Sequence, residues 1–190
     1  MNALALIVLL PFIGAVAVLA TGSRPNLREC LSLGAGITLV GLVASLLPTI
    51  LAGERPVSVL AVPIPGIPIA LEAEPLGMLF ALIASVLWTV TTLYSIGYMR
   101  GHGDTNQTRF YAFFALAIGS TMGIAFSQNL FTLFIFYELL TLSTYPLVTH
   151  AGTDEAKRGG RVYLGILLST SIGFFLLAIV WTWTIAGTTD

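Results

Sequence analysis

Charged residues are scarce in this chain. Of its 190 residues, 9% are Asp, Glu, Lys or Arg, whereas 56% are hydrophobic. Because soluble globular domains contain about 25% charged residues, this composition indicates a membrane protein that is embedded in a lipid bilayer. The formal net charge is −1, so nothing in the charge balance points to a nucleic-acid partner.

Residues that bind metals or carry out redox and nucleophilic chemistry are also few. Cys30 is the only cysteine, which excludes an internal disulfide, and the only histidines are His102 and His150. This set does not supply a zinc or haem cluster, so we expect no metal and no cofactor. No glycine-rich phosphate loop follows a strand pattern, and no Ser-His-Asp arrangement stands out. We therefore expect no enzyme chemistry in the chain itself, and a quinone-linked redox role is disfavoured because no cofactor ligands are present.

Long apolar runs dominate what remains. A transmembrane helix needs about 20 mostly apolar residues, and six segments qualify: 3–20, 27–51, 75–98, 110–126, 129–149 and 162–185. No Lys or Arg precedes the first segment, whereas a secretory signal peptide begins with basic residues, so we interpret it as a retained helix. The sequence thus predicts an all-α membrane protein, a bundle of six transmembrane helices forming a single domain over 1–190.

The basic residues predict the orientation of the bundle. Seven of the eight lie in the connections between helices 1 and 2, 3 and 4, or 5 and 6: Arg24, Arg28, Arg100, Arg109, Lys157, Arg158 and Arg161. Only Arg55 lies in a connection on the other side. The positive-inside rule makes the three basic connections cytoplasmic, so the N-terminus and Asp190 lie outside. We therefore expect a multi-pass protein of the inner (plasma) membrane.

The outer loop 53–75 is not a span. It contains three acidic residues and five prolines, and the strand-like stretches VSVLAV and IPIALE flank PIPG. A β-hairpin and an irregular proline-rich loop both fit this pattern. Elsewhere, small residues mark places where helices can approach closely, namely Gly119 and Gly123 in one segment and Gly165, Ser169 and Gly173 in another.

Glu138 is the one acidic residue at membrane depth, near the middle of 129–149. A charged carboxylate there costs about 2.5–3.5 kcal/mol on the insertion scale, so it should face protein or water. Intramembrane acids commonly bind and release ions or protons, which makes Glu138 the main candidate for proton transfer. The alternative is a protonated Glu138 that hydrogen-bonds a neighbouring helix and only stabilises packing.

Hydroxyl groups continue along the same helix face. At about 100° per residue, Thr141, Tyr145 and Thr149 lie within about 60° of Glu138, and His150 follows them. This row can hold ordered water and carry protons toward the cytoplasmic end. Thr and Ser also occur at ordinary helix interfaces in membranes, and His150 also fits a surface position, so both interpretations stay open. His102, in GHGD, is expected in a solvated loop.

Three stretches carry a family resemblance: LYSIGYMRG, RFYAFFALAIGSTMGIAFSQNLFTLFIFYELLTLSTYPLVTH and EAKRGGRVYLGILLSTSIGFF. They resemble the antiporter-like proton-translocating subunits. That family includes NuoL, NuoM and NuoN of respiratory complex I, the A and D subunits of Mrp cation/proton antiporters, and their counterparts in membrane-bound hydrogenases. The resemblance covers about 75–185, and its most specific part, NLFTLFIFYELLTLSTYPLV, contains Glu138.

The resemblance implies a role in a multi-subunit membrane complex, either a proton-pumping oxidoreductase or a cation/proton antiporter. The chain would move protons, or exchange Na⁺ for protons, and its partners would be other membrane subunits and the lipid bilayer. In the family, the glutamate at the position of Glu138 pairs with a lysine on a broken seventh helix. None of the six predicted helices contains a lysine, so we expect the N-terminal portion of a larger fold, or a second chain that supplies this lysine. A scaffold subunit that no longer transports ions is the alternative function.

Overall fold

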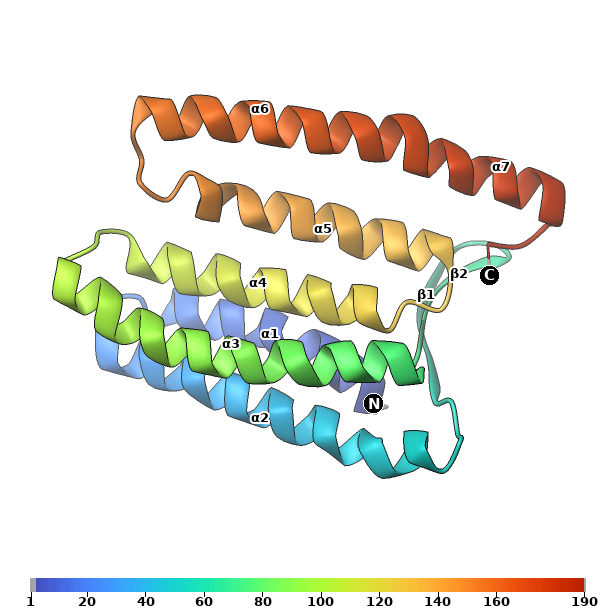
Figure 1. The fold of residues 1–190 in the computed structure, drawn as a ribbon, viewed down its shortest axis with the longest axis horizontal. Helices are drawn as coiled ribbons and strands as arrows, with labels where there is room; N and C mark the ends of the chain where they lie inside the picture. Colours follow the sequence, from blue (N-terminus) through green and yellow to red (C-terminus); the bar gives the residue numbers. More distant parts are fainter. Residues whose placement is uncertain (1–2, 190) are drawn as a thin grey trace.

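The computed structural model describes residues 3–189 and consists mainly of long helices lying side by side, with a β-hairpin across one end (Figure 1). In chain order its elements are α1 (Ala3–Ala20), α2 (Pro25–Leu51), β1 (Val57–Ile64), β2 (Ile67–Glu72), α3 (Pro75–His102), α4 (Gln107–Ala125), α5 (Leu130–Val148), α6 (Asp154–Thr170), the π-helical η1 (Ser171–Leu176) and α7 (Leu177–Ala186). The last three elements follow one another directly and form one long helix, so the described residues contain six helices in all. Both ends of the described chain lie on the hairpin side of the bundle (Figure 1).

Five of these helices are long and apolar enough to cross a membrane: α1, α2, α3, α5 and the last helix, Asp154–Ala186. The fourth helix, α4, does not reach the same hydropathy, since Gln107, Thr108 and Arg109 open it. It packs against α1, α3 and α5, and a helix covered by its neighbours needs less lipid-compatible surface. The predicted six helices are confirmed, five of them apolar enough for spans, while the crossing of α4 stays a prediction.

The helices extend beyond the apolar segments that predicted them. α2 begins at Pro25, a residue favoured in the first turn, and α3 continues to His102. α6 begins at Asp154, eight residues before the predicted start, because the Thr153 side chain caps the Ala156 N–H at 3.1 Å. Lys157 therefore lies in the first turn of α6, and the expectation that no helix contains a lysine is wrong. Hydropathy locates the apolar part of a helix, whereas polar caps determine where it ends.

The loop at 53–75 forms the hairpin, and the irregular-loop alternative is wrong. Strands β1 and β2 pair antiparallel, and Ile64 and Ile67 form the last pair before the turn. Pro65 and Gly66 occupy the turn, where Gly66 has a φ of 84°. A proline followed by a residue with positive φ is typical of a type II turn, which explains why PIPG closes the hairpin.

The hairpin is bonded to the segment that leads into α5. Strand β2 exchanges backbone hydrogen bonds with the α4–α5 connection, and two side chains of that segment add further bonds: Glu72 N to Phe126 O (2.7 Å), Gln128 N to Ala70 O (3.0 Å), Asn129 Nδ2 to Pro68 O (2.9 Å) and Ala70 N to Thr132 Oγ1 (2.9 Å). These bonds fix where α5 begins, and with it the depth of every side chain along α5.

The predicted GxxxG pair on α4 is a packing contact. A Cβ at Gly119 would lie 2.7 Å from a ring carbon of Phe12 on α1, and a Cβ at Gly123 would overlap the ring of Phe136 on α5. Both glycines therefore let an aromatic ring from a neighbouring helix lie against the α4 backbone. The second predicted stripe differs, because a Cβ at Gly165 has no neighbour within 4 Å among residues 3–189.

Candidate functional site

Glu138 lies near the middle of α5. Asn129 is the N-cap of this helix, and its side chain accepts a hydrogen bond of 2.8 Å from the Thr132 N–H. Glu138 follows Leu130 by eight residues and precedes Val148 by ten. At about 1.5 Å per residue, its Cα lies roughly 12 Å from one end of α5 and 15 Å from the other. The predicted position of this carboxyl within an apolar helix is thus confirmed.

The carboxyl group of Glu138 is partly buried and incompletely bonded. Its Oε1 atom is buried and has no hydrogen-bond partner within residues 3–189. No Lys or Arg in this part of the chain forms an ion pair with it either. Buried polar atoms nearly always have partners, because an unpaired one costs about 1–3 kcal/mol. α5 therefore presents, near the middle of an apolar helix, a buried carboxyl oxygen that has no partner among residues 3–189.

A shallow pocket opens on the surface between α5 and the π-helical segment. The pocket measures about 400 Å³ and is lined by Tyr137, Thr170, Ser171, Phe174 and Phe175. Glu138 does not line it, although its neighbour Tyr137 does, and the Tyr137 and Phe175 rings meet edge to face at 6.3 Å.

The hydroxyl row that follows Glu138 is present, but hydrogen bonds do not join it to the carboxyl. Thr141 and Thr149 are buried, and Tyr145 is half-buried. Thr149 Oγ1 donates to the Tyr145 carbonyl at 3.0 Å, within its own turn, and no bond links Glu138 to Thr141 among the described residues. A proton path along these three residues stays a prediction.

One hydroxyl pair was not predicted. Thr144 Oγ1 lies 3.1 Å from Tyr163 Oη and joins α5 to α6. Thr144 points about 120° away from Glu138 around the helix. It therefore does not belong to the predicted hydroxyl row, whose members lie within about 60° of Glu138. Only the packing of α6 against α5 brings the two hydroxyls together.

His150 lies in the turn after α5, half-buried against α4. Its carbonyl accepts a hydrogen bond of 3.2 Å from Arg109 Nη2, and its ring meets that of Phe110 at 5.6 Å. Its Nδ1 is buried and has no partner among residues 3–189. Burial lowers the pKa of His150, the Arg109 charge lowers it further, and Asp104 opposes both. His150 is therefore neutral at pH 7 and able to accept a proton. It follows Glu138 by twelve residues, roughly 18 Å along the helix axis, which is too far for a proton to pass directly between the two side chains.

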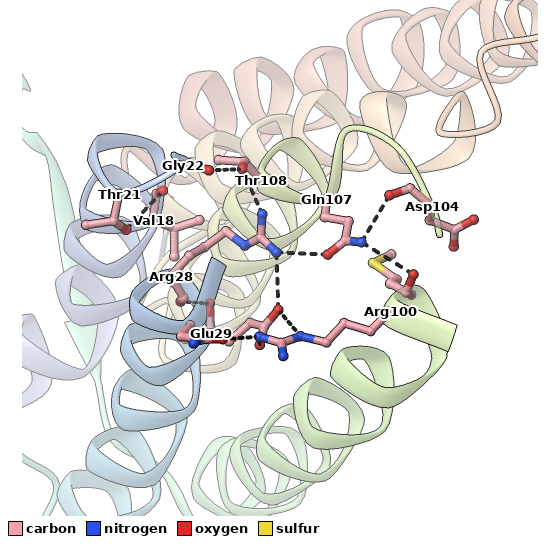
Figure 2. Close-up of polar contacts among 12 residues, drawn as sticks. Val18, Thr21, Gly22, Arg28, Glu29, Arg100, Asp104, Gln107 and Thr108 are labelled. Carbon is pink, nitrogen blue, oxygen red and sulfur yellow. Dashed lines mark hydrogen bonds and ion pairs between the residues drawn. The ribbon is translucent and has the colours of Figure 1, made fainter. Parts of the chain in front are cut away.

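A buried ionic cluster joins α2, α3 and α4 at the end away from the hairpin (Figure 2). The Glu29 carboxylate accepts hydrogen bonds from Arg100 Nη2 at 2.6 Å and from Arg28 Nη2 at 3.2 Å. Arg28 also donates to Gln107 and Thr108 on α4, at 2.8 and 3.0 Å. Arg28 and Glu29 are 4% and 5% exposed, so this ion pair lies inside the protein.

This cluster was not predicted, because Arg28 and Arg100 were assigned to the connections between helices. Both belong to helices, and the partners of Arg28 on α4 are 79 and 80 residues away in the chain. The one available signal was the charge pair Arg28–Glu29 inside an otherwise apolar helix start. Within residues 3–189, no group of His, Cys, Asp and Glu is arranged to hold a metal ion.

Two family models match this chain. The model described as "NADH:quinone oxidoreductase/Mrp antiporter, TM" matches residues 127–190, which include α5 and Glu138. The model described as "NADH-Ubiquinone oxidoreductase (complex I), chain 5 N-terminus" matches residues 64–111, from the hairpin turn to the start of α4. The two matched stretches follow one another in chain order and overlap most of the region, about 75–185, for which the sequence suggested a resemblance.

The chain is also similar in sequence to individual antiporter subunits. Na(+)/H(+) antiporter subunit A1 of Staphylococcus aureus (strain bovine RF122 / ET3-1) is 32% identical over 114 residues, which are 57% of this chain and 14% of the relative. The chain thus spans only a small part of the length of its curated relatives.

Two solved structures share the fold. One is the membrane-bound sulfane sulfur reductase, an archaeal respiratory membrane complex, with a TM-score of 0.84 and 17% identity over 100% of this chain and 29% of the other. The other is the Mrp complex from Dietzia sp. DQ12-45-1b, with a TM-score of 0.80 and 19% identity over 100% of this chain and 36% of the other. In both cases the entire arrangement of helices and hairpin aligns with part of a longer membrane subunit.

Proposed function

Because this chain belongs to the antiporter-like membrane subunits, of which it matches the N-terminal part, we propose that it helps to translocate protons, or to exchange Na⁺ for protons, within a multi-subunit membrane complex. It is an integral membrane protein, and its curated relatives are Na⁺/H⁺ antiporter subunits.

The single observation that carries the proposal is Glu138. An acidic side chain in the middle of a membrane helix is costly unless it pairs or binds a proton. Its buried Oε1 has no partner within residues 3–189, so the carboxyl group still has the capacity to bind a proton or to pair with a cation. We assign Glu138 the role of proton-binding group, with Thr141, Tyr145, Thr149 and His150 as members of a path toward the basic end of the bundle.

The cation that pairs with Glu138 has to come from elsewhere. Lys157 is the only lysine in the chain, and it lies in the first turn of α6, 3.8 Å from Asp154. We propose that another segment or another subunit supplies a lysine next to α5. Movement of that positive charge toward Glu138 favours release of the proton, and its withdrawal favours binding.

The test is Glu138→Gln in the assembled complex, which keeps the side-chain volume and removes the titrating group. Glu155→Gln is the matched control, because Glu155 is an exposed acid in the first turn of α6. Proton movement is measured as formation of a pH gradient in sealed membrane vesicles, and assembly is measured on native gels. We expect Glu138→Gln to abolish most proton movement with assembly intact, and Glu155→Gln to leave both unchanged.

Two results contradict this assignment. Normal pH gradients with Glu138→Gln would mean that this carboxyl takes no part in transport. Loss of the subunit from the complex, with normal transport per assembled complex, would instead favour the scaffold function, in which Glu138 only stabilises helix packing.

A further inference from the structure

The end of the helix bundle that lies away from the hairpin carries an excess of basic residues. Seven of the eight basic residues lie at or near this end, together with four acidic ones, Glu29, Asp104, Asp154 and Glu155, which leaves a net charge of +3 there. Figure 1 shows that the α1–α2, α3–α4 and α5–α6 connections all lie at this end. A concentrated positive charge at the membrane surface attracts anionic lipids.

A surface cavity opens among these charges, where α2 begins and where α3 meets α4. It measures about 550 Å³ and is lined by Arg24, Pro25, Asn26, Arg100 and Gln107. The Arg24 side chain is exposed and has no hydrogen-bond or ion-pair partner in the part of the chain that the structure describes. Its guanidinium is therefore available to a ligand.

The second guanidinium of the cavity is held in place. Arg100 donates to both oxygens of Glu29, at 3.1 and 2.6 Å, and to Asn26 Oδ1. Figure 2 shows Arg100 reaching from α3 to Glu29 on α2. About half of the Arg100 side chain stays exposed, 48% against 6% for Glu29. Glu29 is also shared with the buried Arg28, so the three arginines outweigh the one carboxylate and the cavity keeps an excess of positive charge.

Aromatic side chains place the cavity at the depth of the lipid headgroups. Tyr94, Tyr98 and His102 are spaced four residues apart on α3 and stack on one another, with ring centroids 5.8 and 4.2 Å apart. Tyr94 and Tyr98 are exposed. Exposed tyrosines of membrane proteins gather at the interface between lipid and water. Arg100 lies between Tyr98 and His102 along the helix, and therefore at the same depth.

We propose that this cavity binds the phosphate of an anionic phospholipid headgroup. Guanidinium groups match the geometry of phosphate oxygens and form charge-assisted hydrogen bonds with them. The Asn26 and Gln107 side chains at the rim add polar contacts, and the exposed Leu27 beside them offers an apolar surface to an acyl chain. Soluble phosphate has the same chemistry, but the interfacial depth of the site favours a lipid.

The experiment compares two single charge changes at the same end of the bundle. Arg24→Gln removes the free guanidinium of the cavity. Arg158→Gln is the matched control, since Arg158 is an exposed arginine of α6 outside the cavity. The assembled protein is purified from its membrane, and native mass spectrometry counts bound phosphatidylglycerol and bound phosphatidylcholine. Inorganic phosphate is then added at millimolar concentration as a competitor.

We expect phosphatidylglycerol to bind in preference to phosphatidylcholine, and Arg24→Gln to weaken its binding about fivefold, the size of one surface arginine. Arg158→Gln should change it by less than about twofold. Equal losses in both variants would show a general attraction to the basic end and would overturn the site. Displacement of the lipid by inorganic phosphate would show a soluble anion as the ligand and would also overturn the proposal. Because neither variant touches Glu138, these results are independent of the transport assay.

Discussion

Replacing Glu29 by alanine should destabilise the protein much more than replacing Glu74 by alanine. Both carboxylates form a short ion pair with an arginine, Glu29 with Arg100 and Glu74 with Arg55, each with an N–O distance of 2.6 Å. They differ in burial, because the Glu29 side chain is 6% exposed and the Glu74 side chain 52%. The pair of substitutions therefore tests how much burial changes the contribution of a carboxylate.

The loss of stability in each variant depends on whether the arginine that remains is buried or exposed. Without Glu29, the charge of Arg28, whose side chain is 5% exposed, stays inside the protein with no counter-ion. Breaking a buried ion pair in this way costs about 3–5 kcal/mol. Without Glu74, Arg55 simply remains in solvent, and exposed pairs contribute about 0–1 kcal/mol. The difference, roughly 3 kcal/mol, corresponds to a factor on the order of 100 in the unfolding equilibrium.

The measurement is a denaturant titration of the purified protein followed by tryptophan fluorescence, because the chain contains three tryptophans. A third variant, Arg28→Met combined with Glu29→Leu, removes both buried charges and keeps much of the volume. Apolar replacement of a buried pair is often neutral or stabilising, so this double variant should recover most of the stability lost with Glu29→Ala. Equal midpoints for Glu29→Ala and Glu74→Ala would refute the reasoning, as would a double variant less stable than Glu29→Ala.

Two further predictions concern α4 and the turn after α5. Gly123→Leu forces a side chain into the ring of Phe136 and should destabilise the protein by about 1–3 kcal/mol or more. Gly165→Leu should not destabilise it, because a Cβ at Gly165 has open space among the described residues. Thermal unfolding of the two variants checks this difference. Burial and Arg109 lower the pKa of His150 below 6.5. As the pH falls, His150 therefore becomes protonated at a higher pH in the unfolded chain than in the folded protein. The stability from neutral His150 is complete above about pH 6.5 and is lost as the pH falls below it, and His150→Gln should flatten the pH dependence of the melting temperature in that range; an unchanged pH profile would contradict it.

The helices could be predicted from the sequence because a transmembrane helix requires a run of about 20 mostly apolar residues, and such runs are easily recognised. Segment 3–20 has the same bounds in the structure, and 75–98 begins where α3 begins. The helix ends were harder, since α6 starts with DEAKRGG, a polar stretch that a hydropathy window discards. There the signal is local, namely a capping threonine followed by two acids, which favour the first turn of a helix.

The candidate site was predictable in part for a related reason. Glu138 stands out because a lone carboxylate in an apolar helix is rare. The ionic cluster of Arg28 and Glu29 did not stand out, because charges near helix ends are common and its partners come from α3 and α4. Whether such a charge faces water or the protein depends on how helices pack, and the sequence pattern of one helix does not contain that information.

The orientation of the bundle is open to a direct test with engineered cysteines. Cys30→Ser removes the only thiol, and single cysteines are then introduced as Ser23→Cys at the basic end and Glu54→Cys near the hairpin, both at exposed positions. The reagent is a maleimide that does not cross membranes, applied to intact cells and to inside-out vesicles.

Because basic connections stay in the cytoplasm, Ser23→Cys should react only in inside-out vesicles and Glu54→Cys only in intact cells. The two sites lie at opposite ends of α2, a helix of 27 residues that is about 40 Å long, enough to separate them by a bilayer. The reverse labelling pattern would invert the orientation, and the proposed path from Glu138 to the basic end of the bundle would then lead to the outer side of the membrane. Labelling of both cysteines from one side would mean that α2 does not cross the membrane.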